Sequence, residues 1–355
     1  MLAGVWLLVI LPAKNHFKLS PFIRIKYAIL GGFMVDQYAL YNLKDKKNRK
    51  LYLSEYDWYK SRYINDPFDK MLDNKIICTE VLHHYINVPK IYFLKNKGKM
   101  ILFPASSGAS LEDQNRWANV RDILNLIDEH SPLFIKPLAE GKGNGVCRVE
   151  KIQLEEGLSG SIYMIDDKRV NEQELIRYLE KRNNYFICQG ISQCEYLNNL
   201  YDKTTNTIRF ITLRDPETGK FKVFFAVQRI GTKQTIPVDN GSRGGLVANI
   251  DLETGMLSEA QSLHSLARYK VHPDSNNPIE GVTVPNWEAI KEQMLELAAR
   301  FPNLNFVAWD ILIDENDEVC VIEANKSSGV NIIQLWGPQK QGELGDFYRF
   351  HGAIK

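Results

Sequence analysis

The sequence predicts an α+β protein in which antiparallel strand pairs are combined with amphipathic helices. Residues 307–313 (VAWDILI) and 319–325 (VCVIEAN) read as two strands joined by a tight acidic turn. A glycine-rich turn joins a second candidate strand pair, 133–137 and 146–150. Residues 171–182 carry apolar side chains at helical spacing, as expected for a helix that packs on a sheet.

The first residues form an almost wholly apolar run, 2–11, that ends at Pro12. This run is too short for a membrane-spanning helix, which needs about 20 residues. It has no basic segment before it and no small-residue cleavage site, so we expect no signal peptide. We expect a buried strand or helix here, with a weak peripheral membrane contact as the alternative and no stable insertion.

Residues 20–70 are rich in Tyr, Phe, Lys and Asp. Aromatic residues interleaved with basic ones can indicate a nucleic-acid surface. Acidic residues are mixed in throughout, which favours a helical packing layer with solvated charges. The chain of 355 residues holds 44 Lys or Arg and 43 Asp or Glu, a net charge of +1, so it offers no electrostatic case for a nucleic-acid partner.

Further elements follow from apolar spacing and from helix and strand end signals. Helices are predicted at 73–88, 110–130 and 287–300, and strands at 91–94 and 185–190. His83 and His84 lie on or beside the first of these helices and, without a third ligand nearby, are expected to be structural or exposed.

The cysteines predict neither a disulfide framework nor a zinc site, because they are odd in number and lack a CxxC spacing. They are Cys78, Cys147, Cys188, Cys194 and Cys320. A reducing cytoplasm is the simplest setting, so we expect a cytoplasmic protein.

The turn at 140–145 follows a strand that carries a lysine. Gly141, Gly143 and Gly145 let the backbone approach an anion, and their N–H groups can hold phosphate. Lys136 lies among apolar residues, where a lone ammonium is costly without an anionic partner. No helix follows the glycines, so this is neither a Walker A nor a Rossmann sequence. A phosphate-binding flap and a purely structural turn both remain open.

Two arginines, Arg209 and Arg229, interrupt apolar strands further along the chain. If they face inward they need anions, whereas at a sheet edge their stems could pack with the charged heads in water. Packing at a sheet edge is plausible for either arginine alone and less plausible for the two together. The loop 239–245 that follows is rich in backbone donors.

The hairpin at 307–325 places oxygen ligands on one face. If it closes on residues 315–318, Asp310 lies opposite Glu323, and Asn325 shares their face by the two-residue period of a strand. Two carboxylates and a carboxamide suit Mg²⁺, especially with phosphate oxygens to complete the shell. Acidic residues on a hairpin are usually solvated, but here they sit within apolar strands, which favours the metal site.

Six motifs, in order, resemble the ATP-grasp fold and, more narrowly, the sugar-transfer-associated ATP-grasp family found with polysaccharide biosynthesis. They are NTIRF (206–210), VDNGSRGG (238–245), HPD (272–274), Pro285 with Trp287, WDI (309–311) and IEAN (322–325). The resemblance covers about residues 70–335 and implies two α/β subdomains that clasp ATP. The implied organisation is an N-terminal region 1–70, a substrate-side subdomain 71–130, ATP-grasp subdomains 131–190 and 191–335, and a tail 336–355.

The resemblance also implies roles for individual residues. Lys136 would hold the α- and β-phosphates, and the flap Gly141, Lys142, Gly143, Asn144 and Gly145 would close over the β- and γ-phosphates. Gln189, Gly190 and Ile191 would contact adenine, with Gln193 or Glu195 near the ribose. Asp310, Glu323 and Asn325 would bind one or two Mg²⁺ ions, with Mn²⁺ able to replace them. Arg209 would face the transferring phosphate or the acyl phosphate. The candidates for substrate contact are Asn206, Arg229, Asp239, Asn240, Gly244, Gly245, His272 and Asp274.

The implied activity is that of a carboxylate–amine ligase, which uses ATP to form an acyl phosphate that an amine then attacks. Lys136, Arg209 and Arg229 would neutralise charge on the transferring group. The implied partners are an amine or amino acid and a sugar acid. A kinase acting on a hydroxyl group and a non-catalytic nucleotide-binding scaffold are the alternatives, and the oligomeric state is open.

Overall fold

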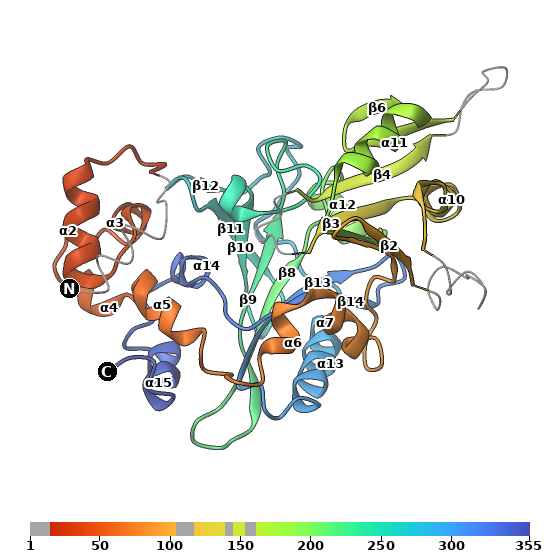
Figure 1. Cartoon of the computed structure of the whole chain (residues 1–355). Helices are drawn as coiled ribbons and strands as arrows, with labels where there is room; N and C mark the ends of the chain where they lie inside the picture. Colours follow the sequence, from red (N-terminus) through yellow and green to blue (C-terminus); the bar gives the residue numbers. More distant parts are fainter. Residues whose placement is uncertain (1–14, 104–116, 139–144, 153–160) are drawn as a thin grey trace.

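The computed structural model describes residues 15–103, 117–138, 145–152 and 161–355. Within these ranges the strands form two seven-stranded sheets, and all pairings within them are antiparallel. Figure 1 shows the first sheet with α10 and α11, and the second sheet, around β8, β9 and β13, with α13 and α15 beside it. This arrangement confirms the predicted α+β class.

The first sheet has the strand order β2-β1-β7-β3-β4-β5-β6. Its strands are β1 (Ile91–Asn96), β2 (Lys99–Leu102), β3 (Leu133–Pro137), β4 (Cys147–Ile152), β5 (Ile162–Ile165), β6 (Lys168–Asn171) and β7 (Tyr185–Gln189). One face is covered by α10 (Val120–His130) and α11 (Glu172–Lys181) in an apolar cluster that includes Leu133 and Ile135. By strand alternation the next residues, Phe134 and Lys136, point to the opposite face.

The second sheet has the order β12-β11-β10-β9-β8-β13-β14. Its strands are β8 (Ile208–Arg214), β9 (Phe221–Ile230), β10 (Leu246–Ile250), β11 (Leu257–Ser262), β12 (Arg268–Tyr269), β13 (Phe306–Ile313) and β14 (Val319–Asn325). One face packs on α13 (Trp287–Ala299) and α12 (Glu195–Leu200). The other is covered in part by α5 (Glu55–Ser61), α14 (Val330–Gln334) and α15 (Glu343–Phe350).

Short helices fill residues 21–73, which confirms the helical layer predicted for this segment. They are α2 (Pro21–Gly31), α3 (Val35–Leu40), α4 (Asn48–Leu51), α5 and α6 (Lys70–Asp73). Helix α7 (Lys75–Leu82) follows, and the side chain of Asn74 accepts hydrogen bonds from the N–H groups of Ile76 and Ile77 at its start.

Several predicted boundaries shift by a few residues. Helix α7 ends at Leu82, with His83 as its C-cap and both histidines exposed. The helix expected within 110–130 begins at Val120, and the part before 117 lies outside the described residues, as does the apolar run 2–11. No helix in the described part of the chain is long and apolar enough to cross a membrane.

Candidate active site

A cleft lined by residues of both sheets lies between them. Its apolar lining includes Pro89, Ile91, Phe134, Val146, Phe186, Ile191, Val238 and Ile322. Its charged lining residues are Lys75, Lys136, Arg229, Asp239, Asp310 and Glu323. A cavity that combines these two linings suits a ligand with an apolar ring and several anionic groups.

The hairpin β13–β14 pairs Asp310 with Glu323 and Ala308 with Asn325, as the sequence predicts. The ladder closes at Ile313 and Val319, one residue earlier than expected, and a bulge after Asp310 restores the predicted pairing. The three oxygen-bearing side chains therefore lie on one face. The amide of Asn325 donates to the Asp310 carboxylate across 3.4 Å.

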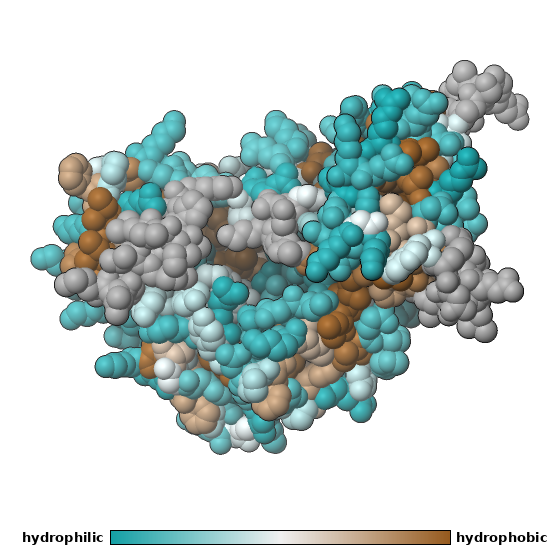
Figure 2. Space-filling model, in the orientation of Figure 1, coloured by the Kyte–Doolittle hydropathy of each residue, from teal (hydrophilic) through white to brown (hydrophobic). Residues whose placement is uncertain are grey.

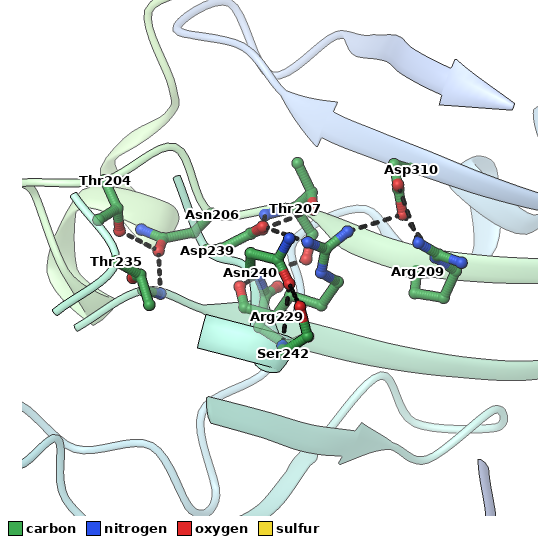
Figure 3. Close-up of polar contacts among 12 residues, drawn as sticks. Thr204, Asn206, Thr207, Arg209, Arg229, Thr235, Asp239, Asn240, Ser242 and Asp310 are labelled. Carbon is green, nitrogen blue, oxygen red and sulfur yellow. Dashed lines mark hydrogen bonds and ion pairs between the residues drawn. The ribbon is translucent and has the colours of Figure 1, made fainter. Parts of the chain in front are cut away.

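Two arginines and two aspartates form a chain of alternating charge beside this hairpin (Figure 3). Arg209 donates twice to Asp310, at 2.6 and 3.0 Å. Arg229 bridges Asp310, at 3.1 Å, to Asp239, at 2.6 Å. Asp239 also accepts hydrogen bonds from the backbone N–H and the hydroxyl of Thr207. Both arginines thus face inward and have anionic partners, which are carboxylates of the protein itself.

Burial and ion pairing act in opposite directions on Asp310. Burial favours the neutral carboxyl, but Arg209 and Arg229 outweigh it, so the pKa of Asp310 is lowered below its ordinary value. The side chain of Arg229 is 13% exposed; burial lowers its pKa, but Asp239 and Asp310 outweigh burial and leave the pKa raised. Burial raises the pKa of Asp239 even though Arg229 and Thr207 act against it, so the pKa values of the two aspartates shift in opposite directions.

The oxygen atoms of Asp310, Glu323 and Asn325 are of the type that binds a hard divalent cation. Glu323 is half-buried, and its carboxylate has Lys75 at 3.5 Å, while Asn325 offers a carboxamide oxygen on the same face. Asp310 would share its oxygens with two arginines. No group of three His, Cys, Asp or Glu side chains within the described ranges is placed to hold a metal, so phosphate oxygens would have to complete the shell.

Lys136 lies on β3 and projects into the cleft between the sheets. Its ammonium is 5.9 Å from the centre of the Phe134 ring. The strands β3 and β4 pair as the predicted strand–turn–strand unit. Gly145, at the end of the turn, has a φ of 69° that glycine adopts without strain. Gly141, Lys142, Gly143 and Asn144 lie outside the described residues.

The predicted adenine segment follows the buried strand β7. Gln189 and Ile191 line the cleft. The N–H of Gly190 donates to the carbonyl of Pro132 at 2.9 Å, and a Cβ at this position would lie 2.5 Å from that oxygen. A second hollow, joined to the cleft through shared lining residues, includes Gln193 and Glu195. The Gln193 side chain already binds within the protein, through contacts that include Asn198, Thr204 and Asn206.

The residues predicted to contact substrate fall into two groups. Asp239 and Asn240 line the cleft. The side chain of Asn206 is buried and holds the carbonyls of Leu197 and Tyr201. The contacts of Asn206 fix the polypeptide beside the cleft. For Asp239, Asn240 and Asn206 alike, a role in substrate contact stays a prediction.

His272 is fully buried, with its Nε2 donating to the carbonyl of Gly231 at 2.8 Å. Its Nδ1 accepts hydrogen bonds from two backbone N–H groups, so both ring nitrogens are used inside the protein. Asp274 accepts from the N–H of Lys233. Neither residue is among those that line the cleft within the described part of the chain, nor are Gly244 and Gly245.

Sequence reasoning missed Lys75. This lysine is the first residue of α7 and lines the cleft, 3.5 Å from Glu323. Nothing in the local sequence pattern separates Lys75 from other helical lysines. Only its contact with a strand almost 250 positions later assigns it to the cleft.

Comparison with known proteins defines the class. The chain has the ATP-grasp fold. It belongs to the sugar-transfer associated ATP-grasp family, whose model matches residues 55–342. No curated protein matches the chain.

Among solved structures, the chain is similar to the ATP-grasp ligase PsnB in complex with a minimal precursor, at 14% identity and a TM-score of 0.40, over 82% of this chain and 64% of that one. It is also similar to N5-carboxyaminoimidazole ribonucleotide synthetase from Thermotoga maritima (9% identity, TM-score 0.35, 72% of this chain and 42% of that one). A third is the D-alanine-D-alanine ligase from Coxiella burnetii, at 12% identity and a TM-score of 0.35, over 72% of this chain and 47% of that one. The chain spans less than half the length of the first solved structures it matches.

Proposed function

We propose that this protein is an ATP-dependent carboxylate–amine ligase that joins an amine or amino acid to a sugar acid in surface polysaccharide biosynthesis. The amide would form through an acyl phosphate, with release of ADP and inorganic phosphate. Family membership supports the use of ATP. The observation that carries the proposal is that Lys136 from the first sheet meets Arg229, Asp310 and Glu323 from the second sheet in one partly apolar cleft.

The charge balance of this cluster supports a polyphosphate ligand. Four cations, Lys75, Lys136, Arg209 and Arg229, stand against three carboxylates, Asp239, Asp310 and Glu323. Lys136 would bind phosphate oxygens from the first sheet. Arg209 and Arg229, held rigid by their aspartates, would stabilise charge that develops on the transferring phosphoryl group.

In the proposed reaction an oxygen of the substrate carboxylate attacks the γ-phosphorus of ATP and the bond to ADP breaks. The amine nitrogen then attacks the acyl carbon, phosphate leaves, and the amine proton passes to the solvent. Mg²⁺, held by Asp310, Glu323 and Asn325, would neutralise phosphate charge when bound. The protein supplies position and charge in this scheme, and no side chain acts as a nucleophile.

The test is acceptor-dependent ADP release with Mg²⁺, with pooled amino acids screened against pooled uronic acids. We expect release that requires one compound from each pool and that falls at least a hundredfold, an order typical of a lost transition-state contact, in Asp310→Asn and Glu323→Gln. Glu318→Gln is the matched control, because Glu318 belongs to the same hairpin but binds Asn87 outside the cleft.

Other outcomes would replace the proposal. Phosphate retained on a hydroxyl acceptor would show a kinase. ATP binding without release in any pool, in a protein that otherwise folds, would support a scaffold. Equal release by the parent and by both cleft variants would contradict the metal-site assignment.

A further inference from the structure

Helix α2 is a well-defined helix at the edge of the molecule (Figure 1). The hydroxyl of Ser20 accepts a hydrogen bond from the N–H of Phe22, and Pro21 occupies the first turn. Gly32 ends the helix with a φ of 72°, where its N–H donates to the carbonyl of Ala28. Both ends are thus fixed by the sequence itself.

The inner face of α2 is anchored in a small apolar cluster. Tyr27 is buried there with Phe33, Tyr41 and Leu43, and its hydroxyl donates to the Leu43 carbonyl. Ala28 is also buried. This cluster anchors the inner side of the helix.

The outer face of α2 is apolar and exposed. Its residues Phe22, Ile25, Ile29 and Leu30 are 83%, 45%, 49% and 61% exposed. At about 100° per residue they share one side of the helix with Lys26. Figure 2 shows hydrophobic side chains on the surface at the edge where Figure 1 places α2. We call these five residues the α2 surface.

A basic segment packs beside α2, against the ring of Tyr27. The Arg49 guanidinium lies 5.1 Å from the centre of the Tyr27 ring, which brings the segment 44–50 (KDKKNRK) against the helix. Lys44, Lys46, Lys47 and Lys50 in this segment are exposed. Residues 1–50 hold nine Lys or Arg and two Asp or Glu, although the whole chain is nearly balanced at 44 to 43. The part of the sequence that includes α2 is thus more basic than the rest of the chain.

We propose that the α2 surface and the basic segment 44–50 bind an anionic lipid bilayer. The apolar side chains would enter the interface while the lysines meet the headgroups. A helix of 11 residues is about 16 Å long and would lie on the membrane rather than cross it. A second copy of the chain is a poorer occupant, because a two-fold interface would set the two lysine clusters against each other.

The experiment is sedimentation of the full chain with vesicles of phosphatidylglycerol and phosphatidylcholine in equal parts, and with phosphatidylcholine alone. We expect binding to the anionic vesicles that weakens as salt is raised. Ile29→Glu should lower the partition coefficient at least about tenfold. Ile101→Glu is the matched control, because Ile101 is 40% exposed on β2, at the other side of the molecule in Figure 1.

Three results would overturn the proposal. One is an absence of binding to anionic vesicles by the parent. Another is equal partition by the parent and Ile29→Glu. The third is a parent that sediments as a dimer without vesicles and becomes a monomer on Ile29→Glu, which would make the α2 surface an interface between copies. Loss of binding in Lys46→Glu/Lys47→Glu with ADP release unchanged would support the bilayer and separate this proposal from the proposed activity.

Discussion

Asp310 accepts hydrogen bonds from two arginines at the position where a metal ligand is proposed. It is buried, so its charge depends on these partners for stabilisation. The same carboxylate therefore contributes to the fold and to the proposed chemistry. A loss of activity on its replacement needs to be separated from a loss of stability.

We predict that Asp310→Asn lowers the free energy of unfolding by about 3 kcal/mol, because it leaves two buried guanidinium groups with one carboxylate. Asp202→Asn, which breaks the exposed pair of Asp202 with Lys203, should cost less than about 1 kcal/mol. Urea denaturation of both variants tests this. Similar losses in the two would contradict the structural role assigned to the buried chain.

At the scale of single elements, the hairpin β13–β14 shows how much the sequence predicts. Alternation within two apolar segments was enough to pair Asp310 with Glu323 and to place Asn325 on their face. It could not predict the bulge after Asp310, since a bulge changes the count of residues without changing their composition. The strands predicted at 91–94, 133–137 and 185–190 also form, while the predicted helix ends moved by several residues.

Long-range pairing is what the sequence did not predict. The need of Arg209 and Arg229 for anions follows from their apolar neighbours, but their partners lie up to 101 positions away, at Asp310 and Asp239. Local periodicity carries no information on such pairs. The same limit hid Lys75, whose contact with Glu323 joins a helix to a distant strand.

Helix α5 gives a pH-dependent prediction. The carboxylate of Asp57 accepts from the N–H of Ser54, which caps the helix, and pairs with Lys340 at 3.2 Å and Lys60 at 3.3 Å. Burial raises the pKa of Asp57, but Lys340, the Ser54 N–H and Lys60 outweigh it, so the pKa is lowered from its ordinary 3.8.

We expect Asp57→Asn to lower the free energy of unfolding by about 1.5 kcal/mol at neutral pH. A depressed folded-state pKa stabilises the protein above 3.8, and this contribution declines as the pH falls toward the folded-state value. The difference between the parent and the variant should therefore be constant from neutral pH down to about 5 and then shrink. Urea titrations at a series of pH values measure it. A difference that stays constant at low pH would show that the charge of Asp57 is not what stabilises α5.

At the scale of the whole molecule, residues 53–65 of the N-terminal region pack into the same core as one face of the second sheet. Gln334 on α14 donates to and accepts from the backbone of Leu53, at 2.9 and 2.8 Å. Asn65 makes the same double contact with the backbone of Phe306 on β13. Leu53 packs with Ile211, Phe347 and their neighbours. The boundary predicted at residue 70, between the N-terminal region and the next subdomain, therefore stays a prediction.

Residues of both sheets line the cleft, so a nucleotide bound there would contact both of them. We predict that MgADP at about 100 times its dissociation constant raises the free energy of unfolding by about 2.7 kcal/mol. Lys136→Met should lose most of this gain, because Lys136 is the cleft lysine contributed by the first sheet. Lys151→Met is the control, since Lys151 pairs with Asp128 away from the cleft. Thermal unfolding with and without MgADP measures both. If Lys136→Met gained as much as the parent, nucleotide would not bind against β3, and the subdomains proposed at 131–190 and 191–335 would not clasp it between them.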